Sequence, residues 1–240
     1  MRNRIVIMSF VLSVLWSTAQ NGEPDLEYLQ PIITKLQKKW PDNRTINLVF
    51  HGHSVPSGYF TKGVVDTFGS YPYLSLKKIK NHYEYAVLNT ITTSIGGEQS
   101  EQGSKRFKEE VLNHHPDVIF IDYALNDRAI GLERAKLAWE TMITDAKNYG
   151  AKVILMTPTP DLNEDIGSLD SELSQHSEQI RSLAKAFKVG LVDSYALFRK
   201  IAKREDLKAY MAQNNHINER GHELVADSIL VFFEYKNTDK

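Results

Sequence analysis

Short apolar runs recur along the chain, and longer segments with apolar residues at helical spacing lie between them. Each run has the length of a short strand, several are rich in valine and isoleucine, and most are bounded by Pro, Gly, Asn or Asp. Runs of this kind predict buried β-strands. The predicted strands are residues 46–50, 85–90, 117–121, 152–156 and 189–192.

The segments between these runs predict helices. The clearest is "LERAKLAWETMITDAKNYG", where apolar residues recur at helical spacing and Gly150 follows as a helix stop. Strands that alternate with helices are typical of βαβ units, so we expect an α/β fold with a parallel sheet and helices on both faces. The predicted helices are residues 25–39, 71–82, 98–113, 132–149, 171–187, 194–203 and 219–235.

The N-terminus has a different pattern from the rest of the chain. Arg2 and Arg4 precede an apolar run over residues 5–16, and small residues follow up to Ala19. This is the pattern of a secretory signal peptide over residues 1–19, cleaved before Gln20. The run is shorter than the roughly 20 apolar residues of a spanning helix, so we expect export without stable membrane insertion. Residues 20–44 then form a helical lead-in to one domain over residues 45–240.

Composition narrows the possible functions. Without Arg2 and Arg4, 27 of the 29 basic residues remain against 30 acidic ones, a formal charge of −3. Nucleic-acid-binding proteins usually show a basic excess, so no nucleic-acid partner is expected. The sequence has no cysteine, which excludes thiol nucleophiles, cysteine metal sites and a lipid anchor on cysteine. A mature chain of 240 − 19 = 221 residues is long enough for one sizeable core.

Candidate reactive groups follow three of the predicted strands. Ser54 follows the first strand within "NLVFHGHSVPSGYF", the pair Gly96-Gly97 follows the second, and Asn126-Asp127 follows the third. In open α/β sheets, ligands bind outside the carboxyl ends of the strands. Each group also has an ordinary structural interpretation: a turn serine, a flexible glycine turn, and an Asn or Asp that caps the next helix.

Four of the eight histidines are candidates for a reactive role, and they form two groups. In "NNHINERGHELVADSIL", His216 lies in the loop before the last predicted helix and His222 lies near that helix's first turn. His51 and His53 alternate along a strand and share a face, so they could be read as a metal pair. No carboxylate accompanies them locally, so we expect no metal there.

The order Ser…Gly-Gly…Asn-Asp…His resembles the SGNH (GDSL-like) hydrolase superfamily over roughly residues 45–230. The segment "MTPTPD", residues 156–161, also looks like a segment that follows a strand in many members. The matching positions are Gly52-His53-Ser54, Gly97, Ala124-Leu125-Asn126-Asp127, His216 and Gly221-His222.

This resemblance implies a three-layer, flavodoxin-like α/β/α fold with a mostly parallel five-stranded sheet. It also implies a serine esterase with Ser54 as nucleophile and His216 as base. The backbone N–H groups of Ser54 and Gly97 and the side chain of Asn126 would hold the oxyanion. This serine chemistry needs no cofactor, so none is expected. Tyr59 and Arg128, with Phe60, could line a substrate groove, or they could be ordinary packing or surface residues.

The sequence departs from the superfamily at three positions. His53 replaces the usual Asp beside the serine, Ala124 replaces a Gly, and Gln213 stands where an Asp precedes the histidine by three residues. The Gln213 carbonyl could set the histidine tautomer but brings no negative charge. A main-chain carbonyl or a distant carboxylate could do the same.

The expected function is that of an exported esterase that removes acetyl or other short acyl groups, on carbohydrates by resemblance. Its partner would be a small-molecule or glycan ester. Two alternatives remain open: a lysophospholipase or thioesterase of the same fold, and a non-catalytic glycan-binding relative, which the missing acid motivates.

Overall fold

The computed structural model describes residues 27–234; the expected signal peptide over residues 1–19 and the cleavage site before Gln20 lie outside this range. Its centre is a five-stranded sheet with strand order β2-β1-β3-β4-β5, and every neighbouring pair is parallel. This is the flavodoxin-like order, so the predicted α/β fold is confirmed. The strands are β1 (Thr45–Gly52), β2 (Val87–Thr92), β3 (Val118–Asp122), β4 (Lys152–Met156) and β5 (Gly190–Val192).

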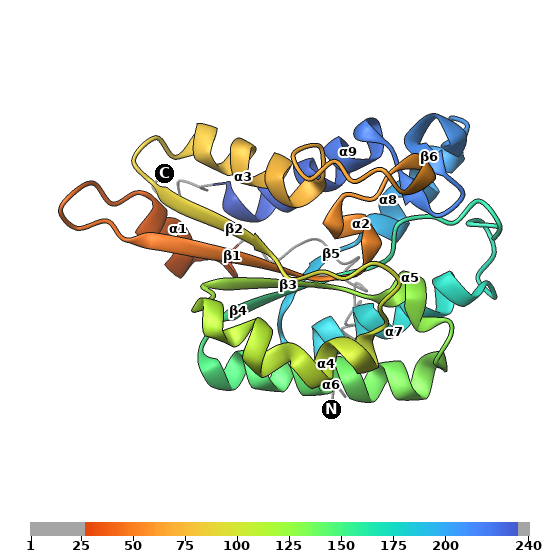
Figure 1. Cartoon of the computed structure of the whole chain (residues 1–240), viewed down its shortest axis with the longest axis horizontal. Coiled ribbons are helices and arrows are strands. Elements are labelled where there is room, and N and C mark those ends of the chain that lie inside the picture. The colour runs from red at the N-terminus through yellow and green to blue at the C-terminus, as the bar shows by residue number, and fades with distance from the viewer. Residues whose placement is uncertain (1–26, 235–240) are drawn as a thin grey trace, which may run out of the picture.

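Helices cover both faces of the sheet, as Figure 1 shows. Helices α1, α3, α8 and α9 pack on one face, and α4, α6 and α7 pack on the other. The α-helices are α1 (Gln30–Leu36), α2 (Ser54–Ser57), α3 (Tyr71–His82), α4 (Ser100–Glu110), α5 (Ala124–Asp127), α6 (Gly131–Tyr149), α7 (Glu172–Phe187), α8 (Ser194–Ala202) and α9 (Glu219–Leu230). Single 3₁₀ turns are η1 (Thr61–Gly63), η2 (Leu112–His114), η3 (Leu207–Tyr210) and η4 (Val231–Phe233).

Strands β1 and β3, in the middle of the sheet, are buried on both faces, which explains their continuous apolar runs. Along β1, Phe50 points into the core under α3 and α9, while its neighbour Val49 points into the core under α4 and α6. Phe50 stacks on Phe120 of β3 with ring centroids 4.2 Å apart. The middle of the sheet is therefore a rigid support for the loops at its carboxyl edge.

The predicted element boundaries agree with the structure to within three residues, except at the start of the first helix and the end of the last, whose predicted bounds of 25 and 235 lie outside the described residues. Strand β2 begins at Val87 rather than 85, because the Ala86 N–H closes a turn onto the Tyr83 carbonyl. Helix α4 begins at Ser100 rather than 98, because the Gln99 side chain caps it by accepting the Gln102 N–H. Gly150 ends α6, as predicted, and it adopts the left-handed conformation.

Some short elements at the carboxyl edge of the sheet have no apolar pattern and were not predicted. They are helices α2 and α5 and a small antiparallel hairpin of β6 (Met211–Gln213) and β7 (His216–Ile217). Each has two to four residues, which is too short for a periodic signal. Between residues 27 and 234, no helix combines the length and the apolar character that a bilayer crossing would need.

Asp127 links the short helix α5 to the longer helices α4 and α6. The suggestion that Asn126 or Asp127 caps the next helix is wrong, since α6 follows Ile130 and has no side-chain cap. Asp127 is instead fully buried, and its carboxylate accepts the Ser100 N–H and the Trp139 indole N–H, each at 2.7 Å. It thereby ties α5 to the start of α4 and to α6.

We predict that Asp127→Ala lowers the free energy of unfolding by about 2–4 kcal/mol, because each buried donor left without an acceptor costs about 1–3 kcal/mol. Urea unfolding followed by circular dichroism measures the change. Asp42→Ala, at an exposed position, is the control and should have little effect. A loss at Asp127 no larger than that of the control would contradict the role given to this carboxylate.

Candidate active site

Ser54 and His216 meet at the carboxyl edge of the sheet. Ser54 starts helix α2 directly after β1, and His216 starts β7 of the hairpin. The Ser54 Oγ lies 2.7 Å from His216 Nε2, although the two residues are 162 positions apart. Each is only 8% exposed. The fold thus joins a hydroxyl to an imidazole that can take its proton.

His53 shapes the start of α2. Its Nδ1 accepts the Val55 N–H, and the third helical residue, Pro56, has no N–H. The Ser54 N–H is therefore the one early donor of this helix without a partner among the described contacts. Because Nδ1 is an acceptor, the ring proton of His53 lies on Nε2, which is 3.3 Å from an oxygen of buried Asp122. His53, which stands where the superfamily usually has an Asp, therefore stabilises the start of helix α2.

Gly97 occupies a tight turn beside the end of β1. The Glu98 N–H bonds to the Ile95 carbonyl, and Gly97 has φ +78°, so residues 95–98 follow the type II pattern that favours glycine at the third position. The Ile95 N–H bonds to the Gly52 carbonyl at 3.0 Å. The turn is thereby attached two residues before Ser54.

Asn126 lies in α5 against the same turn. Its side-chain amide donates to the Glu98 carbonyl at 2.9 Å. Among the described contacts, the second amide hydrogen and the Gly97 N–H have no acceptor. The sheet therefore brings the Gly97 turn into contact with Asn126.

Gln213 contacts the other side of the His216 ring. The hairpin pairs the two residues, and the amide nitrogen of Gln213, Nε2, lies against Nδ1. No carboxylate within residues 27–234 is in ion-pair range of this imidazole. Burial lowers the pKa of His216 below its usual range. The site is a Ser–His pair with a neutral amide at the position of the acid.

The other singled-out histidines are buried and bonded elsewhere. His222 accepts the Tyr71 N–H at 3.2 Å, and burial lowers its pKa to about 3. His51 bonds to Thr93 at 2.8 Å, and burial also lowers its pKa to about 3. Both are therefore neutral near pH 7. Within residues 27–234, no group of three or more His, Asp or Glu side chains is placed to hold a metal.

Of the candidate groove residues, only Tyr59 borders the Ser–His pair. Its ring lies 6.2 Å from the His216 ring at an angle of 24°, and a Cβ at Gly96 would make a tight contact with it at 3.1 Å. Phe60 is packed at 7% exposure. Arg128 pairs with Asp161 and Glu164, which tie the loop after β4 to α5. Tyr59 thus lies beside the Ser–His pair, while Phe60 is packed in the interior and Arg128 is held by ion pairs.

Sequence reasoning missed Glu98, Tyr123 and Asp122, which surround the site with buried polar contacts. Tyr123 donates to Glu98 at 2.7 Å, and Tyr71 donates to Asp122 at 2.9 Å. The only available signal was a charged residue inside the second block, next to Gly97. None of the three has a motif that distinguishes it from a surface residue.

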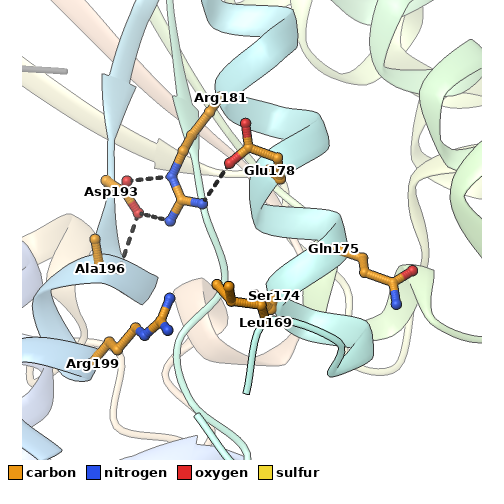
Figure 2. Close-up of a pocket in the computed structure, with 8 residues that line it drawn as sticks. All are labelled: Leu169, Ser174, Gln175, Glu178, Arg181, Asp193, Ala196 and Arg199. Carbon is orange, nitrogen blue, oxygen red and sulfur yellow. Dashed lines mark hydrogen bonds and ion pairs between the residues drawn. The ribbon is translucent and has the colours of Figure 1, made fainter. Parts of the chain in front are cut away.

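A separate cavity of about 440 Å³ lies between α7 and α8, and no residue of the Ser–His site lines it. Figure 2 shows Arg181 placed between Asp193 and Glu178 in this cavity. Arg199 donates to the Gly167 carbonyl at 2.8 Å. Since these charged groups already have partners, the cavity is a less suitable reaction site than the Ser54 region.

The fold resembles solved esterases. One is a two-domain esterase active on acetylated mannans, with a TM-score of 0.73 and 20% identity over 91% of this chain; the chain spans 56% of that protein's length. Another is Axe2, an acetylxylan esterase from Geobacillus stearothermophilus, with a TM-score of 0.69 and 19% identity, covering 80% of this chain and 95% of that one. Catalytic mutants of Axe2 change a serine, a histidine and an aspartate three residues before the histidine.

Sequence comparison gives the family. A curated relative, the uncharacterized lipoprotein YqeF of Bacillus subtilis (strain 168), is 23% identical over 175 residues, which are 61% of this chain and 71% of the relative. Residues 50–224 match the GDSL-like lipase/acylhydrolase family, and this range contains Ser54, Gly97, Asn126 and His216. The chain belongs to this family and is an ester hydrolase of the SGNH fold.

Proposed function

We propose that the protein is an exported serine esterase that hydrolyses acetyl or other short acyl esters on carbohydrates through an acyl-enzyme at Ser54. The observation that carries the proposal is the 2.7 Å contact between Ser54 Oγ and His216 Nε2. It lies within the segment that matches an acylhydrolase family.

In the first step, the Ser54 Oγ attacks the ester carbonyl carbon while its proton passes to His216 Nε2. The tetrahedral intermediate collapses as Nε2 returns the proton to the departing alcohol, leaving an acyl ester on Ser54. Water, deprotonated by the same imidazole, then attacks this ester, and the acid leaves as Nε2 returns the proton to the Ser54 Oγ. A base that is neutral near pH 7 suits this cycle, and the lowered pKa of His216 keeps it neutral.

The oxyanion would be held by three donors. These are the N–H groups of Ser54 and Gly97 and the free amide hydrogen of Asn126. All three lie in the segments that directly follow adjacent strands, and these segments contact one another through Gly52 and Glu98. One such donor is typically worth about 10²–10³ in kcat.

Gln213 would set the tautomer of the base. For Nε2 to accept the serine proton, Nδ1 must carry the other ring hydrogen. In the structure the Gln213 Nε2 faces Nδ1. An amide N–H₂ cannot accept the Nδ1 hydrogen, so the amide must be turned by about 180° to present its carbonyl oxygen instead. This orients the imidazole as a triad acid would, but it gives the imidazolium no charge stabilisation.

Two observations support short acyl groups on carbohydrates. Tyr59 stands between Gly96 and His216 and restricts the space beside Ser54. The similar solved structures are esterases of acetylated mannans and acetylated xylo-oligosaccharides. Export is supported by the apolar run over residues 5–16 and by the lipoprotein relative.

A second candidate is hydrolysis of longer acyl chains, as in a lysophospholipase or thioesterase. It is favoured by apolar side chains exposed on the loops next to Ser54 and Gly96. They are Val64, Val65, Phe68 and Ile95, exposed by 58%, 46%, 79% and 47%. A lipid chain could lie along these residues.

A substrate panel separates the two candidates. The panel contains p-nitrophenyl acetate, butyrate and octanoate, acetylated xylo- and manno-oligosaccharides, and lysophosphatidylcholine. We expect kcat/KM to be highest for the acetyl esters, and Ser54→Ala to lower kcat by about 10⁴-fold or more. Faster turnover of octanoate or lysophosphatidylcholine would favour the second candidate. Equal activity of Ser54→Ala would overturn the acyl-enzyme.

The amide at position 213 yields a pH prediction. Only neutral His216 acts as base, so wild-type activity should fall as the pH drops through a pKa below the usual histidine value of about 6.5. Gln213→Glu places a carboxylate of the same length at Nδ1. Because this carboxylate favours the imidazolium, the pH at which activity falls should rise by about one unit. The substitution should also raise kcat. Gln213→Met is the matched uncharged control. If the activity of Gln213→Glu falls at the same pH as that of the wild type, the assigned contact between residue 213 and His216 is wrong.

A further inference from the structure

The Glu98 carboxylate is buried and held by three hydrogen bonds. Glu98 is 7% exposed, one residue after Gly97. Arg106 of α4 forms a bidentate ion pair with this carboxylate, in which the Arg106 Nε lies 2.8 Å from Oε1. The third bond comes from the Tyr123 hydroxyl at the end of β3, at 2.7 Å. The side chain is therefore fixed from two elements at once.

The Tyr123 hydroxyl is a dependable donor in this place. Burial and the neighbouring Glu98 carboxylate raise the pKa of Tyr123 far above its usual range, so the hydroxyl keeps its proton. It also lies 3.1 Å from His51 Nε2, on β1. The carboxylate is thus linked to the two central strands of the sheet.

The main chain of Glu98 controls two groups at the site. Its N–H closes the turn that holds Gly97 at φ +78°. Its carbonyl accepts one of the two amide hydrogens of Asn126 at 2.9 Å. That bond fixes the orientation of the Asn126 amide group and leaves its second hydrogen without a partner among the described contacts. Hence a shift of Glu98 would move both groups together.

The ion pair alone is a weak reason for this arrangement. Desolvation of a buried pair offsets much of its attraction, so its net contribution to stability is small. Its effect on geometry is larger, because three directional bonds define one position for the carboxylate. Rigid placement of this kind is what an oxyanion site needs, since its donors must be aligned before the reaction.

We propose that Glu98 is a positioning residue that aligns two oxyanion donors, the Gly97 N–H and the Asn126 amide, through its buried contacts with Arg106 and Tyr123. The proposal rests on the esterase function above and assigns Glu98 no contact with substrate. Glu98 acts through the turn, and Tyr123 and Arg106 act through Glu98.

Steady-state kinetics with p-nitrophenyl acetate test this assignment. Glu98→Gln should lower kcat by about 10- to 100-fold with little change in KM, because a misplaced donor is felt mainly in the transition state. Tyr123→Phe removes one of the three bonds and should lower kcat less, in the same direction. Glu110→Gln is the control: Glu110 is an exposed second partner of Arg106, at 2.8 Å, and this change should leave kcat unaltered.

A double-mutant cycle separates positioning from a general loss of stability. If Glu98 acts through Asn126, the kcat loss of Glu98→Gln combined with Asn126→Ala should be clearly smaller than the product of the single losses. Multiplicative losses, or a wild-type kcat in both Glu98→Gln and Tyr123→Phe, would overturn the proposal. Thermal unfolding of each variant shows that the folded enzyme is being compared.

Different results would overturn the proposed function and the positioning role of Glu98. If the wild type hydrolyses no ester, or if Ser54→Ala remains fully active, the esterase mechanism is wrong. If the wild type is active, Ser54→Ala is inactive and the Glu98 variants behave as the wild type, only the positioning role is wrong.

Discussion

The close approach of β1 and β3 at Gly52 is the constraint on which the rest of the site depends. A Cβ at Gly52 would lie 2.4 Å from the Asp122 carbonyl oxygen, so only glycine fits there. The same glycine accepts the Ile95 N–H from the loop after β2. Because Ser54 follows two residues later, this contact fixes the serine helix, the Gly97 turn and the end of β3 in one place. Strand order then makes loops that are distant in sequence into neighbours.

Much of the architecture could be predicted from local pattern, because the central strands are buried on both faces and read as apolar runs. Ser54, Gly97, Asn126 and His216 could be selected because each follows a strand or precedes the last helix, in an order that resembles a known superfamily. Their roles in the reaction remain proposals. The contact between Ser54 and His216 could not be derived locally, since it joins positions 162 residues apart.

What the sequence could not show are polar contacts that depend on tertiary packing. Glu98 resembles a surface residue at the start of a helix, yet α4 and β3 enclose it with Arg106 and Tyr123. His53 departs from the superfamily, yet it caps α2 and reaches Asp122. Gln213 lacks charge, yet the hairpin holds its amide against the base. In each case the surrounding elements, rather than the residue type, determine the role.

Covalent labelling tests the assignment of Ser54 most directly. The full chain, as wild type and as Ser54→Ala, is incubated with a fluorophosphonate while ester hydrolysis is followed, and the labelled peptide is identified by mass spectrometry. The account predicts one label, on Ser54, that increases in step with the loss of activity and is absent from Ser54→Ala. A label on another serine, or full inhibition of an enzyme that carries no label at Ser54, would contradict it.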